Sequence, residues 1–227
     1  MALFPFFMDI CGKEGLIVGG GKHALEKVQR LALFSPCLKV IASGICPEIE
    51  SLAEESVKGH QEMAENEYIE QELVRRITLI RRDFCESDLD SLPAFVIVAG
   101  DDPEENHRIS ELCRERRIPV NVVDDQAYCD FVFPSLIARG DLSVGICTNG
   151  ASPGTGVLLK RKMEQQIPDH IEEILDYLKG KRPEITARVT ERKKRFSLYY
   201  ALSEMCMELD RPLTEPEFEA LIGQKER

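Results

Sequence analysis

Short, almost wholly apolar runs alternate with amphipathic segments through the first half of the chain. The run 94–99 (AFVIVA) carries no polar side chain, which is typical of a strand buried on both faces of a sheet. Between such runs, apolar residues recur at helical spacing. Strands are expected at 15–18, 38–42, 77–80, 94–99 and 119–123, and helices at 24–33, 47–57 and 103–116. This order predicts an α/β fold of the Rossmann type, with a doubly wound parallel sheet.

The rhythm changes after residue 125. Two further strands are expected at 130–137 and 142–147, followed by a helix at 155–166. From residue 168 onward the pattern is amphipathic and helical, with breaks near 180–183 and 210–216. The charged stretch 56–72 is expected to form a surface excursion. The second part of the chain is therefore predicted to be mainly helical.

The charge balance argues against a nucleic-acid-binding protein. The chain has 227 residues and a formal net charge of −11, whereas nucleic-acid binding depends on Lys and Arg facing phosphates. The charge is uneven, because residues 160–195 hold 11 Lys and Arg against 7 Asp and Glu. Such a local basic surface suits an anionic small molecule, although a solvated helix face explains it equally well.

The cysteines and the hydropathy pattern indicate a cytoplasmic protein. None of the eight cysteines forms a C-x-x-C pair or stands near His at metal-ligand spacing, so reduced thiols are expected and no metal site is predicted. The opening MALFPFFM lacks the basic region of a signal peptide. No apolar run approaches the roughly 18 residues that a membrane-spanning helix needs.

A glycine-rich turn joins the first expected strand to the first expected helix. Gly19, Gly20 and Gly21 are followed by Ala24, which gives the pattern G-x-G-x-x-A. In dinucleotide-binding folds the first glycine permits the tight turn, the second lets the backbone approach a pyrophosphate, and the small third residue lets the helix pack on the strand. Free N–H groups at the helix start then face the anion. The alternative is a tight turn that binds nothing.

The residues after the second strand leave the choice of dinucleotide open. An acidic residue about 20 positions beyond the glycines is expected to bind the ribose of NAD. The sequence there reads Val40-Ile41-Ala42-Ser43-Gly44, with no acid before Glu48 and no Arg to meet a 2′-phosphate. Ser43 is a candidate hydrogen-bond partner of a ribose hydroxyl, and Gly44 leaves room for the adenosine.

Taken together, the longer motifs resemble those of the precorrin-2 dehydrogenase family, the type found at the N-terminus of siroheme synthases. The matching pieces lie in order along nearly the whole chain. They are FPFFMDICGKEGLIVGGGKHALEKV at the N-terminus, VIVAGDDPEEN at 96–106, NVVDDQAYCDFVFPSLIARGDLSVGICTNGASP at 121–153, and LLKRKMEQQIP after it. The block from NVVDD to RGDL is far more specific than three glycines.

The resemblance implies an organisation and a reaction. It implies a Rossmann domain over residues 1–124, a small central dimerisation region over 125–163, and a C-terminal helical domain over 164–227. The implied reaction is the NAD-dependent oxidation of precorrin-2 to sirohydrochlorin in siroheme biosynthesis, by a homodimer. Some relatives also insert ferrous iron into sirohydrochlorin, and the sequence leaves that second activity undecided.

The resemblance also implies a set of site residues. The family's important acidic residue falls on Asp124, which follows the fifth expected strand. From its position alone, Asp124 is either a proton acceptor at the carboxyl edge of the sheet or a turn-forming residue beside Asp125. The implied cofactor contacts are Gly19, Gly20, Gly21, Lys22, His23, Ser43 and Gly44.

A polycarboxylate tetrapyrrole needs concentrated positive charge on an acidic protein. Arg and Lys bind carboxylates through charge-assisted hydrogen bonds. Arg139, Lys160 and Arg161 are the first candidates, and Lys162, Arg188, Arg192 and Arg195 are further ones. For each of these residues, a place on a solvated helix surface is the competing interpretation.

Some positions depart from the family pattern. Gly100 stands where Thr is usual, and Cys147-Thr148-Asn149 replaces a run of small residues. His60, His107 and His170 are isolated in the sequence and are expected at the surface. Two other functions stay open: a regulatory module that binds NAD without hydride transfer, and a Rossmann dehydrogenase that acts on a different small anion.

Overall fold

The computed structural model describes residues 3–64 and 76–226. The chain divides into two compact units, Ala2–Val132 and Phe133–Arg227, which are described separately. Among the described residues, no helix is both long enough and apolar enough to cross a membrane.

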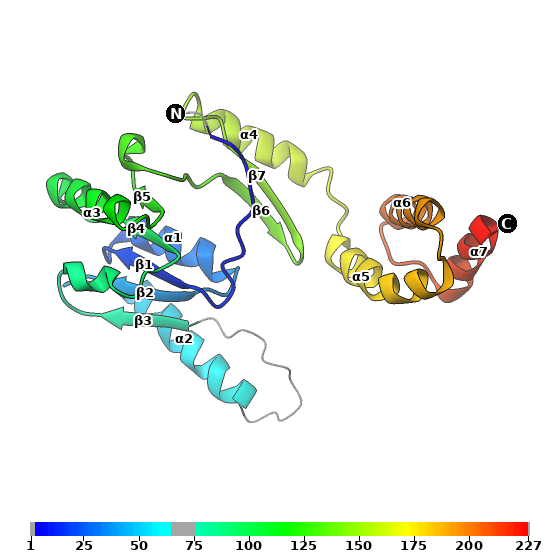
Figure 1. The fold of residues 1–227 in the computed structure, drawn as a ribbon, viewed down its shortest axis with the longest axis horizontal. Coiled ribbons are helices and arrows are strands. Elements are labelled where there is room, and N and C mark those ends of the chain that lie inside the picture. The colour runs from blue at the N-terminus through cyan, green and yellow to red at the C-terminus, as the bar shows by residue number, and fades with distance from the viewer. Residues whose placement is uncertain (1–2, 65–75, 227) are drawn as a thin grey trace. The chain divides into compact units, whose positions relative to one another are not determined.

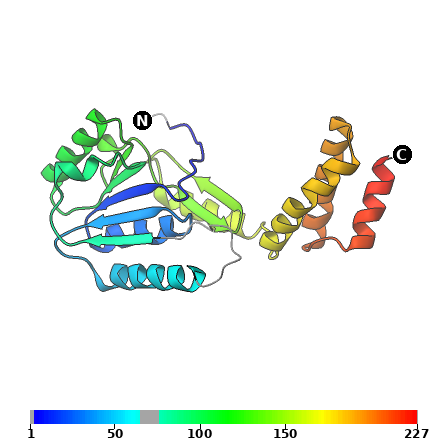
Figure 2. The same cartoon turned by 60° about the horizontal axis from the view of Figure 1, so that its bottom comes forward.

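The first unit is built on a five-stranded sheet whose neighbouring strands are all parallel (Figures 1 and 2). The strand order is β3-β2-β1-β4-β5, so the order reverses between β1 and β4. Ligands of such sheets bind at the carboxyl ends of the strands near this reversal. The strands are β1 (Glu14–Val18), β2 (Cys37–Ile41), β3 (Arg76–Ile80), β4 (Phe95–Val98) and β5 (Val120–Val122).

Helices connect the strands of this sheet. The right-handed rule for such crossovers places the helix that follows β4 on the opposite face from the helices that follow β1 and β2. On the face covered by the helix after β4, Ile109 and Cys113 of that helix form one buried cluster with Leu16 and Val18 of β1. Ile17 points to the other face of the sheet and is buried too, so β1 is covered on both faces. The elements are α1 (Lys22–Ala32), α2 (Pro47–Ala64), α3 (Pro103–Glu115) and the 3-10 helices η1 (Glu86–Leu89) and η2 (Gln126–Tyr128).

These elements confirm the predicted Rossmann-type α/β fold, with two differences. The predicted strand at 130–137 is shorter, because β6 begins only at Ser135. The peptide N–H of Asp130 instead donates to the carbonyl of Val120, and Pro134 has no N–H for a ladder. The second difference is that α2 continues to Ala64, so the predicted excursion at 56–72 starts as helix; residues 65–75 lie outside the described part of the chain.

The second unit begins with an antiparallel hairpin of β6 (Ser135–Arg139) and β7 (Leu142–Ile146). Its turn contains Gly140 at φ 52°, in the left-handed region that favours glycine. The helix α4 (Pro153–Glu164) packs on the hairpin, and its first turn is capped by the Ser152 hydroxyl, which accepts from the N–H of Thr155.

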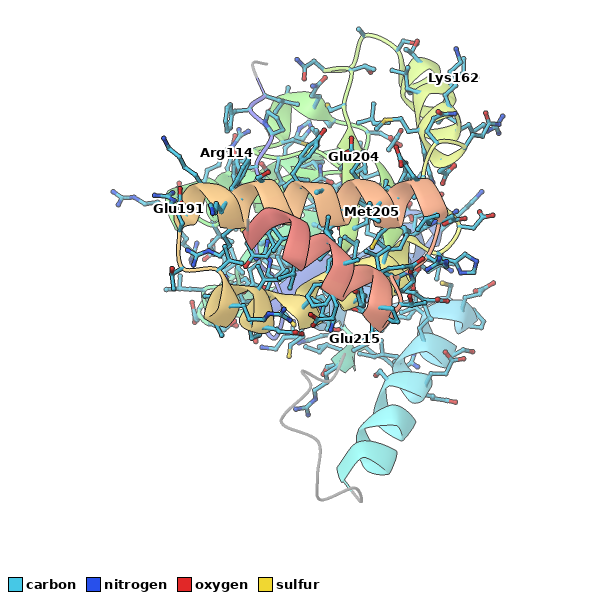
Figure 3. All side chains as sticks on the ribbon, turned by 90° about the vertical axis from the view of Figure 1, so that its right-hand side faces the viewer. Arg114, Lys162, Glu191, Glu204, Met205 and Glu215 are labelled. Carbon is cyan, nitrogen blue, oxygen red and sulfur yellow. The ribbon has the colours of Figure 1, made fainter. Side chains whose placement is uncertain are left out.

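Three further helices complete the second unit, and Figure 3 shows two of them, α6 and α7, in front. Their shared core contains Ile174, Ile185, Leu202 and Phe218, each fully buried. This core explains why the amphipathic pattern after residue 168 folds as a helical bundle. The helices are α5 (Ile171–Arg188), α6 (Arg192–Leu209) and α7 (Glu215–Glu226). The predicted break near 180–183 is wrong, because α5 continues through Pro183 to Arg188. The predicted break near 210–216 is confirmed by the turn between α6 and α7.

Candidate cofactor and catalytic site

The turn after β1 brings two glycines against the backbone of neighbouring strand ends. Gly19 has φ 120°, and a Cβ there would lie 2.4 Å from the carbonyl oxygen of Ala99. A Cβ on Gly20 would lie 2.1 Å from the carbonyl oxygen of Gly44, in the loop after β2. Real Cβ atoms do not approach backbone atoms this closely, so both positions require glycine for the fold itself.

Gly21 differs from these two glycines because the protein does not crowd it. It is the N-cap residue of α1, with φ −88° and ψ −165°, and a Cβ there would meet no heavy atom within 4 Å. Having no side chain, Gly21 also cannot cap the first turn of α1. The positive end of an 11-residue helix therefore faces open space, with the exposed residues Lys22 and His23 in its first turn. This arrangement fits a phosphate group.

The loop after β2 lies directly against the glycine turn. The N–H of Cys46 donates to the carbonyl of Gly20 at 2.9 Å, and the N–H of Gly19 donates to the carbonyl of Ile41 at 2.9 Å. Ser43 and Gly44 are exposed in this loop. The predicted cofactor residues of the two loops are thus brought together at the carboxyl edge of the sheet.

Asp124 lies at the same edge, after β5. Its side chain is exposed, and its backbone has φ 61°, in the left-handed region that non-glycine residues seldom adopt. The half-buried Lys27 of α1 has a favourable electrostatic interaction with the Asp124 carboxylate. Burial lowers the pKa of the Lys27 ammonium, and the Asp124 carboxylate partly offsets that shift.

The adjacent carboxylate, Asp125, has a different partner. Its Oδ2 lies 2.7 Å from Nε2 of His107 on α3, and its Oδ1 accepts from the N–H of Ala127 at 3.2 Å. His107 therefore has a specific partner that its isolation in the sequence did not indicate, although about a third of its side chain stays exposed, as predicted for a surface position. Its partner is 18 residues away in the sequence, and the two meet only because β4 and β5 are neighbours in the sheet.

Gly100, one of the departures from the family pattern, has a packing explanation. The amide Nδ2 of Asn106 donates to the carbonyl of Gly100 at 2.8 Å. A Cβ on Gly100 would lie 2.8 Å from Oδ1 of the same side chain. Asn106 therefore fills the space beside this loop that a larger residue at position 100 would need.

The predicted substrate residues all lie in the second unit. Arg139 ends β6 and is half-buried, and Arg161 is exposed on α4. Lys160 forms a surface ion pair with Glu164, one helical turn away, at 3.6 Å. Of the further candidates, Arg188 is engaged by Glu184 and Glu219, which argues against its binding a substrate carboxylate.

One group of carboxylates in the second unit has the spacing of metal ligands. Oxygens of Glu184, Glu215 and Glu219 lie within 4.8 Å of one another. Lys181 and Arg188 bind these same carboxylates, however, with N···O distances between 2.5 and 3.1 Å. The two cations already balance much of the negative charge, so the group is explained as an ion-pair network of the helical bundle.

Several known proteins are similar to this chain over much of its length. A family model described as "Putative NAD(P)-binding" matches residues 6–135. A siroheme synthase of Thioalkalivibrio sulfidiphilus is 34% identical over 198 residues, which cover 86% of this chain and 36% of that protein. A siroheme synthase of Neisseria meningitidis serogroup C is 30% identical over 197 residues, 86% of this chain and 37% of its own. The chain thus spans little more than a third of these curated relatives.

A solved structure shares the fold over the whole chain. The protein described as "SirC, precorrin-2 dehydrogenase" superposes with a TM-score of 0.69 and covers 99% of both chains, at 20% sequence identity. These relatives support the family resemblance that the sequence motifs carry.

Proposed function

The chain belongs to the NAD(P)-binding family whose model covers residues 6–135, and from this premise we propose that it is an NAD-dependent precorrin-2 dehydrogenase. The reaction removes a hydride and a proton from precorrin-2 and gives sirohydrochlorin, NADH and a proton. When bound, the nicotinamide supplies the hydride acceptor; the protein supplies binding, orientation and a proton acceptor. The relatives named siroheme synthase and precorrin-2 dehydrogenase support this assignment.

The observation that carries the proposal is the position of Asp124 on the glycine-turn edge of the sheet. β1 and β5 are separated only by β4, and both run in the same direction, so the glycine turn and Asp124 follow the same ends of their strands. In the proposed complex, the N-terminus of α1 binds the pyrophosphate, and the Asp124 carboxylate accepts the substrate proton or orients a pyrrole N–H.

We assign NAD rather than NADP as the cofactor. The loop from Ala42 to Cys46 contains no Lys or Arg for a 2′-phosphate. Arg81, which follows the neighbouring strand β3, is engaged by Glu50, with Nη2 and Oε1 2.6 Å apart. A guanidinium in that ion pair is a poor phosphate ligand, and Ser43 provides a hydroxyl for the ribose instead.

Arg139, Lys160 and Arg161 stay candidate ligands of the substrate carboxylates. They belong to the second unit, which carries the basic part of the sequence. A cytoplasmic location is part of the proposal, because all eight cysteines are free thiols, as expected in a reducing compartment.

The direct test mixes the purified protein with precorrin-2 and NAD under anaerobic conditions, without iron. We expect NADH and sirohydrochlorin to appear together in equal amounts, as measured by the absorbance of each product. NADP in place of NAD is expected to give at least about tenfold lower kcat/KM. Addition of ferrous iron to the same cuvette then decides whether the protein also inserts iron.

The same assay separates the alternative functions. Cofactor binding without NADH formation from precorrin-2 would contradict the proposed dehydrogenase. If precorrin-2 also caused no shift in melting temperature, other small anions would be screened in the same way, since a true ligand stabilises the folded state by mass action. A shift with one of them would favour a dehydrogenase of that anion, and no shift with any of them would favour a regulatory module.

We also propose that the protein is a homodimer, formed through its central region. On α4 four apolar side chains are exposed by 41% or more, namely Val157, Leu158, Leu159 and Met163. Apolar side chains exposed together in this way are typical of an interface that the isolated chain leaves uncovered.

Replacement of Leu158 by Glu is expected to dissociate the dimer. Leu158 is the most exposed of the four, so the change removes apolar contact and buries a charge without disturbing the core of the protomer. Sedimentation at micromolar concentration should give a dimer for the wild type and a monomer for the variant. Gln165→Glu, which adds the same charge at the exposed end of α4, is the control and should stay dimeric. A monomeric wild type would contradict the proposal.

A further inference from the structure

His107 joins α3 to the segment that follows β5. Its Nε2 lies 2.7 Å from Oδ2 of Asp125, and about a third of each side chain is exposed. An ionised carboxylate can only accept a hydrogen bond, so Nε2 carries the proton. The imidazole also stacks on the ring of Tyr128, with ring centres 3.7 Å apart and planes 7° from parallel. His107 therefore has two specific contacts, both on the segment that begins with Asp124.

Asp125 is the residue through which this segment is fixed. Its backbone N–H donates to the carbonyl of Val122, and its Oδ1 caps η2 by accepting from the N–H of Ala127. Its carbonyl accepts from the N–H of Tyr128 at 3.2 Å. The buried thiol of Cys129, which has one proton to donate, lies 3.1 Å from the carbonyl oxygen of Val122 and 3.2 Å from that of Asp125. Burial raises the pKa of Cys129, so that this thiol stays protonated and remains a donor.

Other groups of α3 and η2 hold the end of the segment. The Ser110 hydroxyl donates to the carbonyl of Tyr128 at 2.8 Å. Arg114 donates to the carbonyl of Ala127 at 3.1 Å, and its guanidinium lies over the Tyr128 ring, 5.8 Å from the centre. Within the described part of the chain, His107 is the only one of these α3 residues that forms a hydrogen bond with the side chain of Asp125.

These contacts restrain the backbone of Asp124, because Asp125 is the next residue in the chain. Asp124 has φ 61°, and such a left-handed conformation persists in a non-glycine residue when the surrounding structure fixes it. The residue that follows it, Asp125, is fixed on both carboxylate oxygens, on its N–H and on its carbonyl. Loss of the His107 contact would leave Oδ2 without its N–H donor and let the segment 124–128 move.

We propose that His107 is a positioning residue that holds the segment 124–128 so that the Asp124 carboxylate stays directed at the reacting centre. The inference rests on the proposed function for its effect on catalysis, whereas its structural part concerns the segment alone. His107 does not need to contact the substrate or the cofactor. It acts through Asp125, by hydrogen bond, and through Tyr128, by stacking.

The test compares two replacements of His107. His107→Leu removes the N–H donor and the flat ring, whereas the amide of Gln in His107→Gln can place an N–H near the position of Nε2. We expect His107→Leu to lower kcat by about tenfold or more, with KM for NAD changed less than about twofold, because misplacement of a catalytic group affects the chemical step. His107→Gln should recover kcat to within about threefold of the wild type.

Amide hydrogen exchange provides a readout independent of activity. Exchange of the N–H groups of residues 125–128 should increase in His107→Leu and return toward the wild-type rate in His107→Gln, while the amides of β1 stay unchanged. Arg108→Gln is the matched control, because Arg108 is the next residue on α3 and pairs only with the exposed Glu105 in the described contacts. It should leave both kcat and exchange at wild-type values.

The outcomes separate this inference from the proposed function. A wild-type protein that does not oxidise precorrin-2 contradicts the proposed function, whatever the exchange rates are. Unchanged exchange of residues 125–128 in His107→Leu overturns the positioning role, whether or not the wild type is active. With an active wild type, undiminished kcat in His107→Leu overturns it as well.

Discussion

Replacement of Asp124 by Asn is expected to lower kcat for precorrin-2 oxidation by about 10²–10⁴-fold, the usual contribution of a positioned acid or base. NAD should bind the variant as it binds the wild type, because the glycine turn and the loop after β2 are unchanged. Stopped-flow measurement of NADH formation, with the dissociation constant of NAD measured by fluorescence, checks both parts.

Asn is chosen because of the backbone conformation at this position. Asp124 has φ 61°, and Asn adopts this left-handed region more readily than other non-glycine residues. Asp124→Ala would strain the segment and confuse a loss of the carboxylate with a loss of its placement. The Asn variant removes the charge and the basicity and leaves the shape.

Asp90→Asn is a suitable control for this measurement. Asp90 is exposed at the end of η1, before β4, and so lies toward the amino edge of the sheet. The Asp90→Asn substitution removes the same charge as Asp124→Asn, but at the opposite end of the strands, and should leave kcat unchanged. Wild-type kcat in Asp124→Asn would contradict the role of Asp124, and parallel loss of activity in both variants would point to net charge as the cause.

The Rossmann-type core could be predicted because its strands are buried on both faces. In β4 every residue from Phe95 to Val98 is buried, so the strand is a continuous apolar run that no surface helix would produce. The start of the strand predicted at 130–137 was wrong, because the contact that decides it lies outside the local sequence. Its apolar residues look like a strand, but Asp130 returns to pair with Val120, a contact that no local pattern encodes.

Some residues around the site could also be predicted from a local motif, whereas others acquire their neighbours only in the folded chain. The glycine turn is a contiguous motif next to a strand, so the sequence suffices to predict its place. Lys27 and His107 were missed, because each acquires its neighbours through the order of strands in the sheet. The left-handed backbone of Asp124 was equally hidden, because a single Asp in a turn carries no signal for it.

Replacement of Gly21 by Ala is expected to raise the dissociation constant of NAD by about tenfold or more while the fold stays intact. A Cβ on Gly21 would meet no protein atom within 4 Å, and its φ of −88° is open to alanine. The melting temperature should fall by at most about 3 °C, the effect of a weaker N-cap residue. The added methyl group would instead lie in the space assigned to the pyrophosphate.

Gly20→Ala is the matched comparison for this change. Its Cβ would lie 2.1 Å from the carbonyl oxygen of Gly44, so the loop after β2 must move and the melting temperature should fall by more than about 5 °C. The two neighbouring glycines are thus expected to separate folding from binding: the close contact makes Gly20 necessary for the fold, and we propose that Gly21 is necessary for the cofactor. Titration calorimetry with NAD and thermal unfolding of both variants test this division. If Gly21→Ala bound NAD as tightly as the wild type, the pyrophosphate could not lie against the N-terminus of α1, and the glycine turn would be explained by chain packing alone.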